Sequence, residues 1–266
     1  MSETIWVVIP AAGQSQRFGP TNKLDQDLGG RPVLHRSVEL FASRDDVAGI
    51  VVAGPHDDEA FGAFRERHGP KLGMLGCRLC QGGQNTRAES VLAALAHVPD
   101  DAGFIAVHDA ARPCTSERLI DRLFETATRA GAGAAIVPGL DVTETIKRVA
   151  SERVDATPPD PIDAILGGAG REKYAGRAVQ GTLDRTGLVA VQTPQVFGAI
   201  LLRKAYAQTP LDATDDAQLV ERTGATVLVV EGDSHNIKIT TPHDLDLARR
   251  ILNVKAPTLR AAHKRF

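Results

Sequence analysis

Five short apolar runs are spaced along the chain, and segments with helical periodicity lie between several of them. The first run, Ile5–Ile9, is continuous and ends at Pro10. Continuous runs of this length are typical of central parallel strands, which are buried on both faces. The other predicted strands are Gly49–Ala53, Phe104–Val107, Ala134–Val137 and Thr226–Val230.

Four helices are predicted, most of them from apolar residues at a spacing of three or four. Ser116–Ala130 stops before Gly131, a residue type that commonly ends helices. Thr241 and Pro242 suit the N-cap and the first position of a later helix. The other two helices are Arg31–Ser43 and Thr86–His97. Because strands alternate with helices, we expect an α/β fold with a doubly wound, mostly parallel sheet.

One segment, Ser151–Gly181, breaks this alternation. It has no convincing period and is rich in Pro and Gly, so it predicts an exposed excursion. A disordered surface loop and an arm that reaches a partner subunit agree equally well with this composition. We expect one domain over residues 1–254, including a protruding arm at about residues 141–188, followed by a basic tail over residues 255–266.

The composition is that of an ordinary soluble globular protein. The 266 residues are 42% apolar and 24% charged, with a formal net charge of −2. No basic stripe suited to nucleic acid is present, and no segment approaches the roughly 20 apolar residues of a membrane span. Ile5–Ile9 is too short for a signal peptide. We therefore expect a cytoplasmic enzyme or binding protein that engages neither nucleic acid nor membrane.

Cys77 and Cys80 form a CxxC pair, a pattern that zinc and redox sites often use. No second CxxC is present to complete a tetrahedral zinc site. The pair also lies in a segment with strand character, where residues i and i+3 point to opposite faces. We therefore interpret both cysteines as structural.

The first strand leads into a loop of mostly small residues, Pro10–Gly19, and Lys23 follows it. Small residues let the backbone approach a ligand closely, and consecutive N–H groups can surround an anion. Arg17 and Lys23 would add two positive charges suited to a triphosphate. The loop matches neither GxGxxG nor the P-loop pattern, so taken alone it is only weak support for a nucleotide site.

Asp109 follows the predicted strand Phe104–Val107, at the edge where ligands bind in open α/β sheets. Its carboxylate could hold a divalent cation or a ribose hydroxyl, although Asp is also a common turn residue at strand ends. We interpret the neighbouring His108 as a packing or hydrogen-bonding residue rather than as a base.

Gly82 and Gly83 precede the predicted helix that begins near Thr86. The glycines could admit a flat base against the backbone, and Ser90 could hydrogen-bond its edge. Thr86 and Glu89 also fit a capping box, which is a purely structural interpretation. Later motifs carry hydroxyl and cationic groups suited to a phosphorylated polyol. They are Glu144–Lys147, Asp184-Arg185, Gln192–Gln195, Thr214–Asp216 and Asn236–Lys238.

In this order, the motifs resemble those of the 2-C-methyl-D-erythritol 4-phosphate cytidylyltransferase family over about residues 5–252. The likeness rests on Ala-Ala-Gly-x-x-x-Arg-Phe-Gly, Lys23, Gly-Gly with Thr-Arg-x-x-Ser-Val, His-Asp-Ala-Ala-Arg-Pro, Thr-Pro-Gln and Asn-Ile-Lys. It implies a Rossmann-like nucleotidyltransferase fold. It also implies transfer of a cytidylyl group from CTP to methylerythritol phosphate, with release of pyrophosphate, in non-mevalonate isoprenoid synthesis.

The resemblance assigns the motif residues to three ligand groups. The triphosphate would contact Ala11, Ala12, Gly13, Arg17 and Lys23. The cytosine would contact Gly82, Gly83 and Ser90, and Asp109 would assist metal or ribose binding. The acceptor would contact Arg112, Thr145, Arg185, Thr193, Thr214 and Lys238. The residues expected to be catalytic are Arg17, Lys23 and Lys238.

The resemblance also implies Mg²⁺ or another divalent cation, and a homodimer in which the arm crosses to the neighbouring subunit. The implied mechanism needs no covalent enzyme intermediate. The acceptor phosphate attacks the α-phosphorus of CTP in line, so catalysis consists of positioning and charge stabilisation.

Three other functions are compatible with parts of the sequence. A ribitol 5-phosphate cytidylyltransferase would share the fold and reaction, although Ala12 and Ala110 favour the methylerythritol enzyme. A nicotinamide-dependent oxidoreductase is disfavoured because GxGxxG and an acidic residue after Ile50–Ala53 are missing. A non-catalytic nucleotide-binding protein would not require both Arg17 and Lys23.

Overall fold

The computed structural model describes residues 4–13, 18–19, 21–155 and 175–256. The chain divides into two units by its internal packing. The first unit combines Met1–Leu140 with Val191–Phe266, and the second is Asp141–Ala190. The described helices and most of the large sheet belong to the first unit, while the described part of the second contains two short antiparallel ladders.

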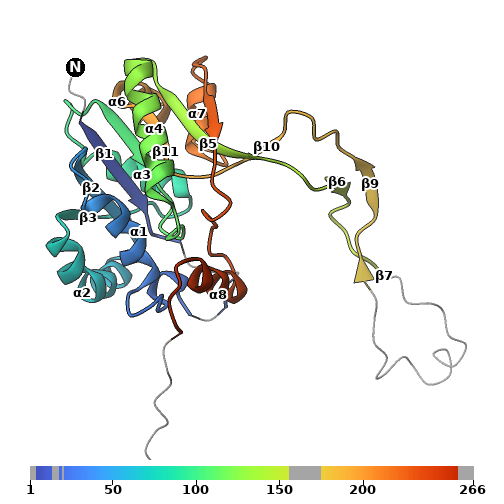
Figure 1. Cartoon of the computed structure of the whole chain (residues 1–266), viewed down its shortest axis with the longest axis horizontal. Coiled ribbons are helices and arrows are strands. Elements are labelled where there is room, and N and C mark those ends of the chain that lie inside the picture. Colours follow the sequence, from blue (N-terminus) through green and yellow to red (C-terminus); the bar gives the residue numbers. More distant parts are fainter. Residues whose placement is uncertain (1–3, 14–17, 20, 156–174, 257–266) are drawn as a thin grey trace, which may run out of the picture. The chain divides into compact units, whose positions relative to one another are not determined.

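Parallel strands form the centre of the large sheet (Figure 1). β1 (Ile5–Pro10) lies between β2 (Val47–Gly54) and β4 (Phe104–Val107), and both neighbours run parallel to it. β3 (Cys77–Gln81) pairs in parallel with β2 and forms one edge. The carboxyl ends of these four strands therefore meet at the same edge of the sheet.

An antiparallel strand connects this parallel centre to the rest of the sheet. β11 (Gln195–Gly198) runs antiparallel to both β4 and β5 (Ala135–Asp141). β12 (Leu228–Glu231) is parallel to β5, and β10 (Val189–Val191) also neighbours β5. The five predicted strands are confirmed, and the sheet is mostly parallel as expected.

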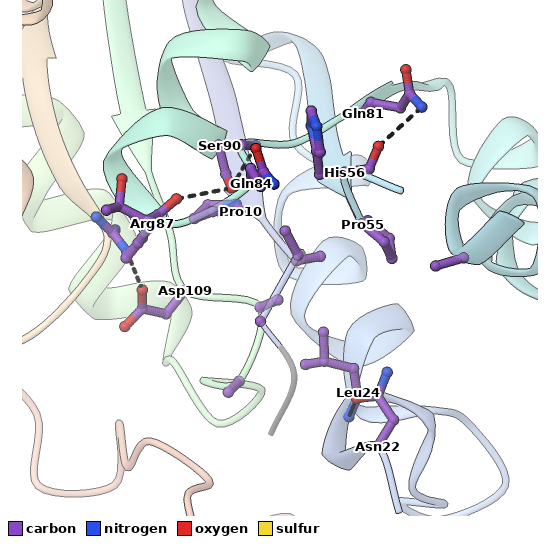
Figure 2. Close-up of a pocket in the computed structure, with 18 of the residues that line it drawn as sticks. Pro10, Asn22, Leu24, Pro55, His56, Gln81, Gln84, Arg87, Ser90 and Asp109 are labelled. Carbon is purple, nitrogen blue, oxygen red and sulfur yellow. Dashed lines mark hydrogen bonds and ion pairs between the residues drawn. The ribbon is translucent and has the colours of Figure 1, made fainter. Parts of the chain in front are cut away.

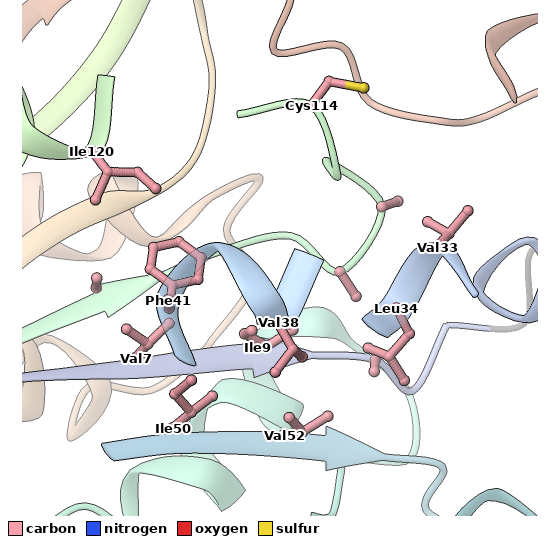
Figure 3. Close-up of a cluster of buried hydrophobic side chains, with 14 of the residues drawn as sticks. Val7, Ile9, Val33, Leu34, Val38, Phe41, Ile50, Val52, Cys114 and Ile120 are labelled. Carbon is pink, nitrogen blue, oxygen red and sulfur yellow. The ribbon is translucent and has the colours of Figure 1, made fainter. Parts of the chain in front are cut away.

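Helices cover both faces of the sheet, which is the predicted doubly wound arrangement. On the face of Val7 and Ile9, an apolar cluster includes side chains of α1, α2, α4 and α8. Figure 3 shows the part of this cluster around α1. The bounds of these helices are Val33–Ala42, Asp58–Met74, Glu117–Ala130 and Pro242–Ile251.

The opposite face, on which Trp6 and Val8 lie, packs against three other helices. They are α3 (Arg87–Leu95), α6 (Ala199–Tyr206) and α7 (Asp216–Glu221). The two cysteines of the CxxC pair follow the same alternation, because Cys77 packs against the first face and Cys80 against the second. The predicted orientation of that pair is therefore confirmed.

Local capping explains where the predicted helices begin and end. The Thr86 hydroxyl accepts a hydrogen bond from Glu89 N at the start of α3, and Thr241 forms a capping box with Asp244 before α8. Gly131 ends α4 with a φ of 73°, a left-handed conformation that glycine adopts without steric cost.

Two short 3₁₀ turns and two small ladders complete the described elements. The turns are η1 (Lys23–Asp25) and η2 (Gly131–Gly133). In the second unit, β6 (Lys147–Val149) pairs with β9 (Val179–Thr182), and β7 (Val154–Asp155) pairs with β8 (Ala175–Gly176). Among the described residues, no helix is both long and apolar enough to cross a membrane.

Candidate functional site

A cleft of about 1370 Å³ opens where the carboxyl ends of β1 to β4 meet (Figure 2). Its walls come from the segments that follow β1, β2, β3 and β4, from the η1 turn, and from Lys238 and Thr240 before α8. The predicted site residues that line it are Ala11, Ala12, Gly13, Lys23, Gly83, Ser90, Asp109 and Lys238. Motifs that are far apart in the sequence therefore come together at one place.

The two glycines between β3 and α3 are required by close packing. A Cβ atom on Gly83 would lie 2.0 Å from Glu89 Cβ, and one on Gly82 would lie 2.6 Å from the carbonyl oxygen of Gly54. The Ser90 hydroxyl accepts a hydrogen bond from Gly83 N at 3.0 Å. The loop is thus held flat against the start of α3, with Gly83 and Ser90 on the cleft wall.

Asp109 is surrounded by three cationic side chains. Its Oδ1 lies 3.0 Å from Arg87 Nε, and its Oδ2 lies 2.8 Å from Lys238 Nζ. Arg112 Nε is 3.6 Å from the same Oδ2. Burial of Asp109 opposes ionisation, but the charges of Arg87 and Lys238 outweigh it and hold the pKa of this carboxyl well below its usual range. Asp109 is therefore a carboxylate throughout the physiological pH range.

Arg87 and Asp216 lie in motifs that the sequence singled out, but the sequence assigned neither residue to the site. Arg87 Nη1 lies 2.8 Å from Asp216 Oδ2, while its Nε contacts Asp109. Asp216 is fully buried and also accepts a hydrogen bond from the Tyr206 hydroxyl. One guanidinium thus joins two buried carboxylates. The sequence feature that could have pointed to them is their position at the start of a helix. Arg87 follows the N-cap Thr86, and Asp216 follows the N-cap Asp215.

A chain of hydrogen bonds fixes the backbone of Asp109. His108 Nε2–H donates to the carbonyl oxygen of Arg112 at 3.2 Å, so Nδ1 of the neutral ring is an acceptor. The Thr193 hydroxyl donates to that Nδ1 at 3.3 Å and accepts a hydrogen bond from Asp109 N at 3.0 Å. Burial lowers the pKa of His108 to about 4, so the ring is neutral at pH 7. His108 is a hydrogen-bonding residue, as predicted.

The other residues predicted to bind the substrates do not all lie on the cleft wall. Arg112 is held beside Asp109 by a 2.6 Å hydrogen bond from its Nη1 to the carbonyl oxygen of Asn236. Thr214 is exposed before α7, where its hydroxyl contacts Gln218 Oε1 at 3.3 Å. Thr145 and Arg185 belong to the second unit, in which the Arg185 guanidinium donates to the carbonyl oxygen of Thr143. Arg17 lies outside the described residues.

Comparison with known proteins gives one consistent family. Residues 5–160 and 169–254 match the family model described as 2-C-methyl-D-erythritol 4-phosphate cytidylyltransferase. A Rhodopirellula baltica protein of that name is 36% identical, over 94% of this chain and 95% of the relative. The Rhodococcus jostii protein of that name is 40% identical, over 92% and 93%.

Solved structures agree with this result. The crystal structure of 2-C-methyl-D-erythritol 4-phosphate cytidylyltransferase from Thermus thermophilus superposes with a TM-score of 0.68 at 33% identity. The alignment covers 94% of this chain and 100% of that structure. A structure of the bifunctional protein IspDF from Campylobacter jejuni matches over 91% of this chain and 53% of its own length, with a TM-score of 0.68 at 26% identity.

Proposed function

Because the chain belongs to the 2-C-methyl-D-erythritol 4-phosphate cytidylyltransferase family, we propose that it transfers a cytidylyl group from CTP to 2-C-methyl-D-erythritol 4-phosphate. The products are 4-diphosphocytidyl-2-C-methyl-D-erythritol and pyrophosphate, and the reaction serves non-mevalonate synthesis of isoprenoid precursors. One observation carries the proposal. A single cleft joins a loop of small residues, Lys23, the Gly83–Ser90 wall and the charged group around Asp109.

The chemistry is an in-line displacement at phosphorus. An oxygen of the acceptor phosphate attacks the α-phosphorus of CTP, and the bond from that phosphorus to the oxygen shared with the β-phosphate breaks. Pyrophosphate leaves with that oxygen. Lys23 stabilises the negative charge that grows on the phosphate oxygens in the transition state, and we assign Arg17 the same role. The Ala11 N–H group donates to the carbonyl oxygen of Ala53 at 2.7 Å, so within the Ala11–Gly13 loop we assign the N–H groups of Ala12 and Gly13 to the triphosphate.

The charged group around Asp109 suits the phosphate of the acceptor. Three cationic side chains face two carboxylates, which leaves one positive charge in excess among these residues. Lys238 lines the cleft, as does Arg87, and we assign Lys238 to the acceptor phosphate. The hydroxyl proton of Thr193 is used inside the fold, so we assign Thr193 to holding Asp109. Thr145, Arg185 and Thr214 remain candidate contacts to the polyol.

A divalent cation fits this cleft as a partner of the substrate. Among the described residues, no group of three or more His, Cys, Asp or Glu side chains could hold a metal ion. Mg²⁺ commonly uses one or two carboxylates and completes its coordination with substrate phosphates and water. Asp109 is an ionised carboxylate on the cleft wall, and both of its oxygens face cations. We therefore assign it to Mg²⁺ and CTP in the state in which Lys238 has turned to the acceptor phosphate. The ion would offset part of the charge of the triphosphate.

We further propose a homodimer in which the arm supplies acceptor contacts to the neighbouring subunit. This is supported by the separate packing of Asp141–Ala190 and by the exposure of Thr145 and Arg185 within it. In a two-fold dimer, each site would combine the sheet unit of one subunit with the arm of the other. Both substrates are charged and phosphorylated, which supports a cytoplasmic reaction.

The direct test is pyrophosphate release with matched substrates. Wild-type protein is incubated with CTP, Mg²⁺ and either 2-C-methyl-D-erythritol 4-phosphate or ribitol 5-phosphate. We expect release with the first acceptor and at least a tenfold lower specificity constant with the second or with UTP in place of CTP. Excess chelator should abolish release. Equal rates with both acceptors would contradict the assigned acceptor, and no release with either would contradict the function.

A further inference from the structure

A buried row of polar side chains ends on the turn that carries Lys23. His68 Nε2 lies 2.8 Å from Asp25 Oδ1, and His68 Nδ1 lies 3.1 Å from His35 Nε2. His68 is 1% exposed and His35 is 8% exposed. His35 belongs to α1, His68 to α2 and Asp25 to η1, so the row connects three elements. None of its members is among the described residues that line the cleft.

When both imidazole rings are neutral, one arrangement of protons satisfies every contact of the row. The carboxylate of Asp25 can only accept, so His68 Nε2–H donates to it. The Nδ1 atom of neutral His68 is then an acceptor, and His35 Nε2–H donates to it. Arg67 makes an ion pair with the other oxygen of Asp25. The His68 N–H group and the Arg67 guanidinium therefore hold the Asp25 carboxylate in a fixed orientation.

This orientation matters because η1 is too short to fix its own geometry. It contains three residues, and single 3₁₀ turns depend on their surroundings for stability. Leu24 is buried in the core cluster on one side of the turn, and Asp25 is bound to His68. Figure 2 shows Asn22 and Leu24, which flank Lys23, at the wall of the cleft. The backbone at Lys23 is therefore held by the Asn22 cap on one side and by the contacts of Leu24 and Asp25 on the other.

We propose that His68, oriented by His35, is a positioning residue for Lys23 and acts through Asp25. By fixing η1, it keeps the Lys23 ammonium in the place where the charge of the reacting phosphates develops. Small displacements of such a group reduce turnover strongly, because transition-state contacts depend on short distances. This inference rests on the proposed function, since it requires Lys23 to take part in cytidylyl transfer.

A double-mutant cycle with Lys23 separates positioning from general destabilisation. We expect His68→Ala to lower kcat about tenfold, with a smaller effect on KM for CTP. In a Lys23→Ala background, His68→Ala should change kcat by less than about twofold, because the residue it positions is already gone. The same tenfold loss in both backgrounds would overturn the inference.

Conservative variants keep the test valid if His68→Ala folds poorly. His35→Gln retains an N–H donor toward His68 and should keep kcat within about twofold of wild type. His35→Leu lacks this donor, so its kcat should fall several-fold. Arg31→Ala, which removes an exposed ion pair with Glu39 near the same helix, is the matched control and should leave kcat unchanged. Equal kcat values for His35→Gln and His35→Leu would overturn the role of His35 and the row.

A spectroscopic readout does not depend on activity. Long-range ¹H–¹⁵N spectra of the wild-type protein at pH 8 should show both His35 and His68 protonated at Nε2, and a proton on His68 Nδ1 would contradict the row. The outcomes also separate the two proposals. Absence of any cytidylyl transfer by the wild-type protein refutes the proposed function itself. Normal turnover of Lys23→Ala removes Lys23 from the mechanism, and the positioning role falls with it.

Discussion

Arg87 contacts Asp109 on one side and the fully buried Asp216 on the other, at distances of 3.0 and 2.8 Å. A carboxylate without a cation is costly in such a place, because burial removes the water that would otherwise stabilise the charge. The cation is as much part of the fold as of the site. Its removal should therefore affect stability as well as substrate binding.

We predict that Arg87→Met lowers the free energy of unfolding by about 3–5 kcal/mol, because the apolar stem remains but the buried charge of Asp216 loses its partner. The free energy of unfolding of Arg87→Lys should lie between those of wild type and Arg87→Met. A single ammonium cannot contact both carboxylates as the guanidinium does. Urea denaturation at pH 8 measures these values. A methionine variant as stable as wild type would show that the contact of Arg87 with Asp216 does not stabilise the fold.

Some residues of the site could be predicted from the sequence, and others could not. Asp109 could be predicted because it follows an apolar strand, and Lys238 because it belongs to the Asn-Ile-Lys motif. The pairing of Arg87 with Asp216 could not, because 129 residues separate them and each has an ordinary helix-start explanation. Thr193 was expected at the acceptor, and only the structure shows its hydroxyl between His108 and Asp109.

At the scale of elements, the loop after β1 and the loop after β3 use glycine for different reasons. An added Cβ on Gly13 meets no described atom within 4 Å, whereas one on Gly83 would collide with α3. We predict that Gly13→Ala keeps the wild-type melting temperature but raises KM for CTP several-fold, because the methyl group occupies the approach of the phosphates. Gly83→Ala should lower the melting temperature and raise KM together. An unchanged KM in Gly13→Ala would remove that residue from the triphosphate site.

The contact between α1 and α2 makes stability depend on pH. Burial lowers the pKa of His35, aided by His68 and Lys71 and opposed by Glu39 and Asp25. The unfolded chain therefore binds a proton more readily than the folded chain as the pH falls below about 6.5. The stability that comes from keeping His35 neutral is fully present above that pH and is lost as the pH falls below it. Buried His108, whose pKa is also lowered, contributes in the same direction.

We predict that the free energy of unfolding falls between pH 7 and pH 5 with a slope that approaches about 1.4 kcal/mol per pH unit for each histidine kept neutral. His35→Gln preserves the hydrogen bond but cannot take up the proton, so it should reduce this slope. Denaturation curves at half-unit pH intervals provide the measurement. A slope identical to wild type would mean that His35 is protonated equally in both states.

The elements show why sequence patterns succeed for some segments and fail for others. The central strands and α4 could be predicted because their apolar residues follow the burial directly. Helix α2 could not, because its buried face consists of Phe64, His68 and Leu72, and a histidine stands where an apolar residue would complete the pattern. Pro70 within the helix obscures it further. The ladders of the second unit lack a buried face, so their sequences show no alternation of apolar and polar residues that would predict strands.

For the whole molecule, the proposed exchange of arms makes a quantitative prediction. If the proposed roles hold, Lys23→Ala should inactivate the site on the sheet unit, and Arg185→Ala should inactivate the arm. When the two inactive proteins exchange subunits, half of the dimers should be mixed, and one of their two sites should contain both intact residues. Roughly a quarter of wild-type activity should return. If mass spectrometry confirms exchange and no activity returns, Arg185 does not act across the interface.

An oxygen-labelling experiment can show whether the acceptor phosphate attacks the α-phosphorus of CTP, as we propose for this cleft. Wild-type protein is supplied with Mg²⁺, unlabelled CTP and 2-C-methyl-D-erythritol 4-phosphate whose phosphate carries ¹⁸O. We predict that ³¹P NMR shows a cytidylyl diphosphate product with ¹⁸O in its bridging position, and that mass spectrometry finds no ¹⁸O in the pyrophosphate. Failure to form the diphosphate, or ¹⁸O in the pyrophosphate, would contradict this mechanism.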